Sequence, residues 1–129
     1  MNELFCSAWW CDNGETGCGG FDVGIGRWDV AGVKDMSEMF KYARAFNQNL
    51  GAWDVSQVVD MDSMFRGAKA FNQNLGAWSV AAVTDMSRMF EHALVFNQNL
   101  GAWDVTKVVD MDKMFYYALG LQSEPGGLE

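Results

Sequence analysis

Proline, histidine and basic residues are scarce in this sequence. It contains one proline, one histidine, and 9 lysines and arginines against 17 aspartates and glutamates, for a formal net charge of −8. A protein that binds nucleic acid needs a basic surface to neutralise phosphates, and this sequence offers none. The same shortage argues against binding to an anionic membrane surface. We therefore expect neither kind of partner.

Long hydrophobic runs and paired cysteines are also absent. No stretch approaches the roughly 18 apolar residues of a membrane span, and no signal peptide is visible at the N-terminus. The three cysteines, Cys6, Cys11 and Cys18, leave at least one thiol over after any internal disulfide. Their spacing lacks the paired Cys-x-x-Cys ligands of structural zinc. We expect no membrane insertion, no metal site and no cofactor, with either free thiols or one disulfide.

Most of the chain is instead one 25-residue unit written four times between residues 21 and 120. Trp recurs at positions 28, 53, 78 and 103, and Phe-Asn-Gln-Asn-Leu-Gly-Ala-Trp occurs unchanged at 46–53, 71–78 and 96–103. A fixed period of this length is typical of solenoids, in which each unit buries its apolar face against its neighbours. We predict an N-terminal cap over 1–20, four repeats over 21–120, and a partial repeat and tail over 121–129.

Each unit has the pattern of a short strand followed by a short helix. Phe46, Gln48 and Leu50 alternate with two asparagines, which is the period of a strand. The apolar positions within 60–68 are spaced at three and four residues, as on one face of a helix, and Asp60 stands where an N-cap belongs. Stacked units place like residues over like, so we expect buried columns of tryptophan and methionine. The predicted fold class is an α/β repeat solenoid of about four coils.

The positions that vary between units predict the outer surface. Positions 41, 66, 91 and 116 carry Lys, Arg, Glu and Tyr, and mixed charge at one register is typical of a solvated helix face rather than a binding stripe. His92 belongs to this outward group, so an exposed helix residue explains it better than a catalytic role. The chain has no nucleophile motif, no histidine–carboxylate pair at a fixed register and no phosphate-binding glycine loop. We predict that it is not an enzyme.

The repeat resembles that of the BspA-like leucine-rich-repeat surface proteins. That family carries Trp-Asp-Val-Ser-x-Val-x-Asp-Met-x-x-Met-Phe units, which residues 53–65 match. The resemblance covers roughly residues 21–120; Ser79 stands where the family usually has aspartate, and residues 1–20 have no counterpart. It implies a leucine-rich-repeat-like right-handed coil with short parallel strands and short helices. It also implies an extracellular or cell-surface setting and roles in adhesion or protein binding, and it supplies no catalytic residues.

The leading functional hypothesis is a non-catalytic module for protein–protein interaction or adhesion. Its ligand face would consist of the repeated asparagines Asn47, Asn49, Asn72, Asn74, Asn97 and Asn99. The competing explanation is a structural ladder, whose amides bond to the backbone and to each other. A second hypothesis is self-assembly into filaments or a surface layer. Pro125 falls where a fifth strand would continue, and proline cannot donate to a sheet ladder, so an end-to-end homo-oligomer is possible.

A third hypothesis is the binding of calcium, a glycan or ice on a repetitive face. Carboxylates such as Asp54, Asp60, Asp104 and Asp110 could gather calcium, which takes several oxygen ligands. Capping and turn roles explain these residues more simply, and Ser79 interrupts one of the carboxylate columns. Ice-binding faces usually show threonine rows, and this chain has none.

Overall fold

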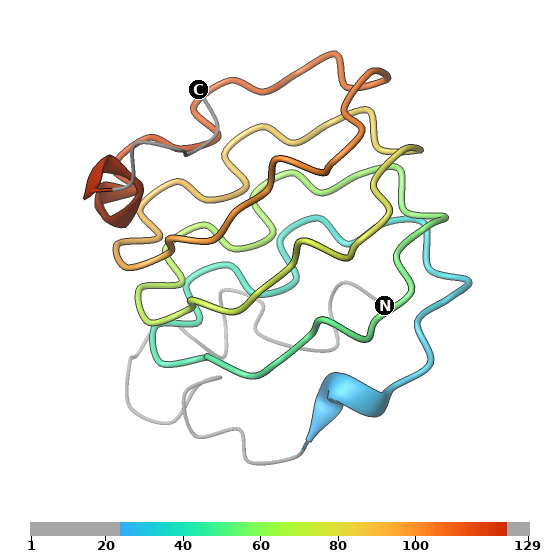
Figure 1. Ribbon diagram of the computed structural model, residues 1–129, viewed down its shortest axis with the longest axis horizontal. Coiled ribbons are helices and arrows are strands. Elements are labelled where there is room, and N and C mark those ends of the chain that lie inside the picture. The colour runs from blue at the N-terminus through green and yellow to red at the C-terminus, as the bar shows by residue number, and fades with distance from the viewer. Residues whose placement is uncertain (1–23, 124–129) are drawn as a thin grey trace.

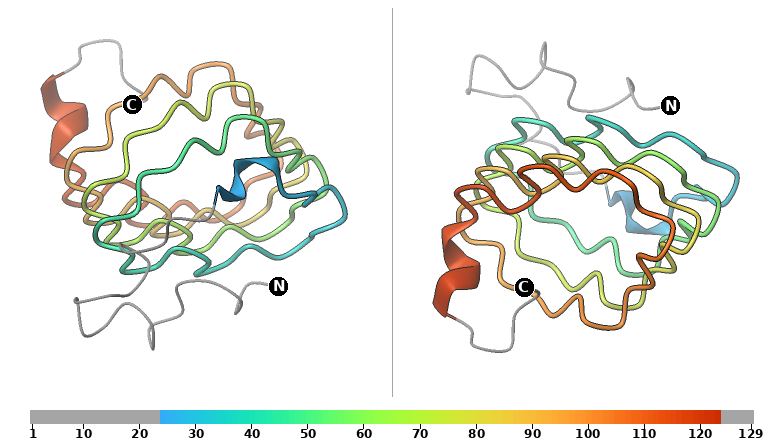
Figure 2. Two further views of the ribbon diagram at one scale, coloured as in Figure 1. Left: turned by 90° about the horizontal axis from the view of Figure 1, so that it is seen from below. Right: turned by 90° about the horizontal axis from the view of Figure 1, so that it is seen from above.

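The computed structural model describes residues 24–123, which wind into a stack of repeating coils (Figure 1). Seen along the stack, successive coils overlie one another around a shared interior (Figure 2). We call each coil a rung: rung 1 is 24–45, rung 2 is 46–70, rung 3 is 71–95 and rung 4 is 96–120. The predicted cap over 1–20, with its three cysteines, and residues 124–129 lie outside the described residues.

The predicted α/β solenoid is wrong in its secondary structure. Residues 24–123 contain no α-helix and no strand; their regular elements are two 3₁₀ helices, η2 at Ile25–Arg27 and η3 at Leu119–Ser123. Sheet pairing is reduced to isolated parallel bridges between Asp35, Asp60, Asp85 and Asp110. The leucine-rich-repeat arrangement of short parallel strands and short helices is therefore not formed here. Neither of these helices has the length and apolar character needed to span a bilayer.

The segments predicted as short helices are ladders between rungs. The N–H of Met61 donates to the carbonyl of Asp85 in the next rung, at 2.9 Å. The other bonds of this ladder run from the N–H groups of Ser63, Phe65 and Gly67 to the carbonyls of Ser87, Met89 and Glu91. Intervening residues close turns within their own rung, as the N–H of Met64 does on the carbonyl of Met61. A helix needs each N–H for the carbonyl four residues back, so donation to the next rung excludes it.

Two positions in each ladder have a left-handed backbone. The angle φ is +57° at Ser63 and +70° at Gly67. The counterparts in the other rungs, with φ between +56° and +61°, are Glu38, Tyr42, Arg88, His92, Lys113 and Tyr117. Such a conformation costs a non-glycine residue about 1–3 kcal/mol, so it persists only where surrounding contacts stabilise it. In rungs 1 to 3 the N–H of each of these residues donates to a carbonyl of the next rung, and this bond supplies the stabilisation.

Side chains replace the main-chain ladder in the segment predicted as a strand. The predicted alternation is confirmed, because Phe46 and Leu50 are buried while Asn47 and Asn49 are exposed. However, the N–H of Asn72 donates to the side-chain Oδ1 of Asn47, at 2.9 Å, rather than to a main-chain carbonyl. A side-chain acceptor keeps the two backbones too far apart to pair directly. The segment therefore has the alternating buried and exposed side chains of a strand, but its backbone is not paired in a sheet.

The core consists of columns of like side chains that run through the stack. The Phe65 ring stacks between those of Phe40 and Phe90, with centroid distances of 5.5 and 5.6 Å, and packs on Phe71 at 4.2 Å. The methionines predicted as a column are fully buried at 36, 39, 61, 64, 86 and 89. The predicted tryptophan column is buried in rungs 2 to 4, whereas Trp28 of rung 1 is only half-buried.

Candidate functional site

The varied ladder positions form one surface, which we call the outer face. Its polar and aromatic members are Glu38, Lys41, Tyr42, Arg66, Arg88, Glu91, His92, Lys113, Tyr116 and Tyr117. Because alternate N–H groups of the ladder are tied to the next rung, each rung presents its outer-face side chains in nearly the same place. Their position on the surface agrees with the sequence pattern, but they stand on a ladder and not on a helix.

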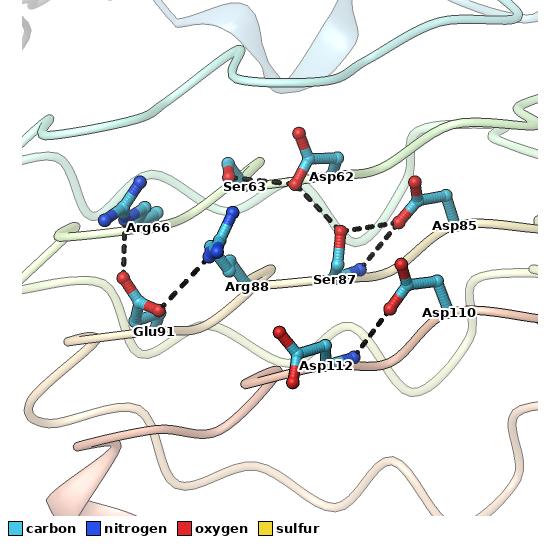
Figure 3. Close-up of polar contacts among 9 residues, drawn as sticks. All are labelled: Asp62, Ser63, Arg66, Asp85, Ser87, Arg88, Glu91, Asp110 and Asp112. Atoms are coloured by element: carbon cyan, nitrogen blue, oxygen red, sulfur yellow. Dashed lines mark hydrogen bonds and ion pairs between the residues drawn. The ribbon is translucent and has the colours of Figure 1, made fainter.

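Glu91 is an exception to the expected solvated face, because it is buried, and so is Ser63 at the register of Glu38, Arg88 and Lys113. The carboxylate of Glu91 lies 2.6 Å from the Nε of Arg66 in rung 2 and 3.7 Å from the Nε of Arg88 in its own rung (Figure 3). The contact with Arg66 is a close ion pair whose angle is too poor for a hydrogen bond. Glu91 is 4% exposed, and buried carboxylates in proteins are normally paired in this way. The three side chains tie rung 2 to rung 3 within the outer face.

Three aromatic rings gather at the rung 4 end of the outer face, and we call them the aromatic cluster. The His92 ring stacks on Tyr117 at 5.0 Å and meets the edge of Tyr116 at 6.0 Å, while the two tyrosine rings lie 4.5 Å apart, edge to face. Tyr116 and Tyr117 are each about half exposed, at 49% and 51%. The neighbouring Tyr117 raises the pKa of the Tyr116 phenol, through charge repulsion and then a hydrogen bond.

A row of carboxylates and serines runs alongside the ladders. The Oδ1 of Asp62 accepts hydrogen bonds from the hydroxyls of Ser63 and Ser87, each at 3.0 Å, and Ser87 also donates to Asp85 at 2.7 Å (Figure 3). These carboxylates act as acceptors for the turns around them. In the described part of the chain, no three His, Cys, Asp or Glu side chains are arranged so that they could hold a metal ion. Calcium binding therefore gains no support from this row.

Asp60 is a half-buried carboxylate residue whose backbone bridges those of Asp35 and Asp85 in the neighbouring rungs. Burial raises its pKa, and the charges of Asp35 and Asp85 above and below it raise the pKa further. The folded state therefore binds a proton at Asp60 more tightly than the unfolded state does, so ionised Asp60 destabilises the fold at neutral pH. We expect Asp60→Asn to be more stable than the wild type at neutral pH. Its advantage should shrink as the pH falls through the raised pKa, as urea unfolding at several pH values would show.

Asp54→Asn is the control of opposite sign. The hydroxyl and N–H of Ser56 both donate to Asp54 and lower its pKa. Its ionised form therefore contributes stability that is present at neutral pH and is lost as the pH falls through the lowered pKa. Asp54→Asn should be less stable than the wild type at neutral pH, with a deficit that disappears in acid. Shifts of the same sign in both variants would contradict this account.

The six asparagines predicted as a ligand face fall into two structural columns. In the first, the Oδ1 of Asn72 accepts from the N–H of Asn97 at 2.9 Å and from the Nε2 of Gln98 at 2.8 Å, and Asn47 serves Asn72 and Gln73 in the same way. In the second, the Oδ1 atoms of Asn49, Asn74 and Asn99 each accept, at 2.8 Å, from the glycine N–H two residues on. The structure thus assigns five of these oxygens, those of Asn47, Asn49, Asn72, Asn74 and Asn99, to rung contacts and turns. A ligand role for the six asparagines stays a prediction.

The aromatic cluster and the burial of Glu91 are two features of the outer face that the repeat pattern does not predict. His92 was placed correctly on the surface, where it is exposed. The signal that could have found the cluster was present: aromatic side chains occupy 42, 92, 116 and 117, at registers where other rungs carry charged or small residues. No comparable signal marks Glu91, because its burial depends on an arginine that comes from the rung before it.

Comparison with known proteins identifies the family alone. No curated protein and no solved structure gives a significant match to this chain. One family model, described as "Mycoplasma protein of unknown function, DUF285", matches residues 11–126 and so covers nearly the whole sequence. The chain therefore belongs to the DUF285 family of Mycoplasma proteins of unknown function.

Proposed function

We propose that this chain is a non-catalytic binding module that recognises a protein partner through its outer face. The observation that carries the proposal is the half-exposed aromatic cluster of His92, Tyr116 and Tyr117 on a framework of stacked rungs. Tyrosine is enriched at the centres of protein interfaces, because it buries a large ring with few rotatable bonds and retains a hydroxyl for hydrogen bonding. The described part of the chain exposes no comparable group of rings elsewhere.

The surroundings of the cluster supply the polar rim of an interface. The guanidinium of Arg66 lies 5.8 Å from the centre of the Tyr42 ring, and Lys113 stands at the same distance from Tyr116. Lys113 is exposed and available to acidic groups of a partner, whereas Arg66 is held by the buried Glu91. The rings cover the apolar surface of the partner. The ladders hold these side chains at fixed spacing, so little conformational entropy is lost when the partner binds.

The sequence resemblance to BspA-like surface repeats supports the same class of function. It concerns the repeat sequence and not the secondary structure, which differs from that of a leucine-rich repeat. On this basis we place the protein at the cell surface or outside the cell, in adhesion or protein binding. The family match is compatible with this proposal but assigns no activity.

A fragment library displayed on yeast and selected against the folded chain would test the proposal. Selected fragments should bind saturably, and Tyr116→Ala combined with Tyr117→Ala should weaken that binding about tenfold or more, as removal of interface centres does. Val95→Lys is the matched control, because Val95 is 48% exposed but lies outside the outer face. Binders that are indifferent to the tyrosines, or a library without binders, would count against the proposal.

The same selection distinguishes the outer face from the asparagine columns. Asn72→Ala removes the acceptor of two contacts to rung 4, so we expect a lower melting temperature. Binding to the selected fragments should persist at temperatures where the variant is folded. A variant that retains its stability and loses binding would move the ligand site to the asparagines.

A further inference from the structure

The ladder segment of rung 4 exposes apolar side chains that the other rungs keep buried. Met111 is 38% exposed, whereas Met61 and Met86 at the same register are fully buried. Phe115 is half-buried, although its counterparts in rungs 2 and 3 are fully buried as well. Rung 4 lies at one end of the stack, in orange (Figure 1). Its ladder segment is therefore an uncovered copy of an internal surface.

The main chain of this segment is an unpaired edge with both donors and an acceptor. In rung 3 the N–H groups of 86, 88, 90 and 92 donate to carbonyls of rung 4, at 2.8–2.9 Å, and the Thr84 carbonyl accepts from the N–H of Val109 at 2.8 Å. In rung 4 the Val109 carbonyl has no donor within residues 24–123. The matching N–H groups have no acceptor within the same residues; they belong to Met111, Lys113, Phe115 and Tyr117. Such an edge is a template to which an extended segment of another polypeptide can add.

We propose that this edge of rung 4 binds an extended segment of a partner protein, which adds to the stack parallel to rung 4. The argument is continuity, because the chain makes the same junction three times, each with parallel pairing and with phenylalanines stacked 5.5–5.7 Å apart. A folded second copy does not fit this role. It would have to offer Met36, Met39 and Phe40 of its own rung 1, and these side chains are 0–1% exposed. An extended segment has its apolar side chains and carbonyls free.

The polar side chains of the edge determine the chemistry of the segment. At one register the four rungs carry, in order, Ser37, Asp62, Ser87 and Asp112, and the Ser87 hydroxyl donates to Asp62 in the rung before, at 3.0 Å. The residue that covers Asp112 should therefore carry a hydroxyl. Lys113 is exposed at the next register, where a facing carboxylate would attract it and a facing cation would repel it. The edge thus selects the order apolar, hydroxyl, acidic, apolar, apolar.

The outer face lies on the side of the stack and this edge at its end, so the inference stands apart from the proposed function. Binding at the outer face depends on aromatic side chains, whereas binding at the edge depends on main-chain groups and on the register of the segment. A partner segment at the edge is also fixed in direction, because parallel pairing places its carbonyls opposite the free N–H groups of rung 4.

A synthetic peptide with the sequence of residues 30–45 is a suitable probe, because residues 36–40 have the selected order. We expect it to bind saturably when it is titrated into the isotope-labelled full chain in reductant. The largest changes in amide NMR shifts should fall on the N–H groups of 111, 113, 115 and 117. Those of 112, 114 and 116 should change less, because they are already bonded within rung 4.

The matched control is the same peptide with Ser37→Asp and Glu38→Lys. It keeps every apolar side chain and sets a carboxylate against Asp112 and a cation against Lys113. It should bind about fivefold more weakly, since like charges that face each other on adjacent strands are destabilising. Both changes are made in the peptide, so the folding of the protein does not affect the comparison.

Three outcomes would overturn the proposal. They are the absence of saturable binding, amide shifts centred outside residues 109–117, and equal binding of the two peptides. Growth of the chain alone into larger species with rising concentration, measured by sedimentation velocity, would also overturn it, because a second copy would then occupy the edge.

Discussion

Replacing Phe65 with alanine is expected to lower the free energy of unfolding by about 3–5 kcal/mol, the usual cost of removing a buried phenylalanine ring. The Phe65 side chain is fully buried and stacks on Phe40, Phe71 and Phe90. Its loss would leave a cavity between three rings that belong to the two neighbouring rungs. Because small domains are stable by only about 5–15 kcal/mol, urea unfolding should show a large shift of the midpoint.

Phe115→Ala is the matched control at the same register. Phe115 is half-buried and closes the column at rung 4, where it stacks on Phe90 at 5.7 Å. Within residues 24–123 the ring of Phe115 stacks on a phenylalanine on one side only, so its removal should cost clearly less than that of Phe65. Equal losses at the two positions would mean that the column does not run through the stack as described.

Replacing Trp78 with alanine should destabilise the protein by a similar amount, about 3–5 kcal/mol. Its indole is 3% exposed, stacks on Trp103 at 6.5 Å, and donates its Nε1–H to the carbonyl of Leu50 in the rung before, at 2.9 Å. The side chain therefore joins three successive rungs through one hydrogen bond and one ring contact. Thermal and urea unfolding would measure the loss.

Trp78→Phe separates the hydrogen bond from the ring. This variant keeps an aromatic ring but removes the donor, and a typical intramolecular hydrogen bond contributes about 0.5–1.5 kcal/mol. The Leu50 carbonyl still accepts from the N–H of Trp53 at 3.0 Å, so it is not left without a partner. We expect a loss of about 1–2 kcal/mol, bond and packing together. No measurable loss would show that the indole N–H does not help to join the rungs.

The sequence predicted the inward and outward directions of side chains well and the secondary structure poorly. Buried phenylalanine, methionine and tryptophan columns follow from the repeat, because polarity alone decides which side chains leave water. The helix predicted over 60–68 failed because so short a helix is marginal without tertiary support. Every second N–H group of this segment instead donates to a carbonyl that lies one repeat further along the chain.

The candidate site likewise has some features that the sequence predicts and others that it does not. The surface position of His92 and the turn roles of the aspartates could be predicted, because they depend on residues within a few positions. The aromatic cluster could not be predicted in detail, because it joins His92 of rung 3 to two tyrosines of rung 4. The pairing of Glu91 with Arg66 likewise requires that the registers of adjacent rungs be known.

By itself the sequence determined the period, the number of repeats and the residues that fill the interior, since these follow from the recurrence of apolar side chains every 25 residues. Only the tertiary structure decided which atoms complete each hydrogen bond. Once rungs stack, each N–H group that forms the ladder has two candidate acceptors. One is the carbonyl four residues back, as in a helix, and the other is a carbonyl of the next rung. Likewise, the Asn47 side chain takes the N–H of Asn72 that a sheet would have used. Local propensity is too weak to settle that competition.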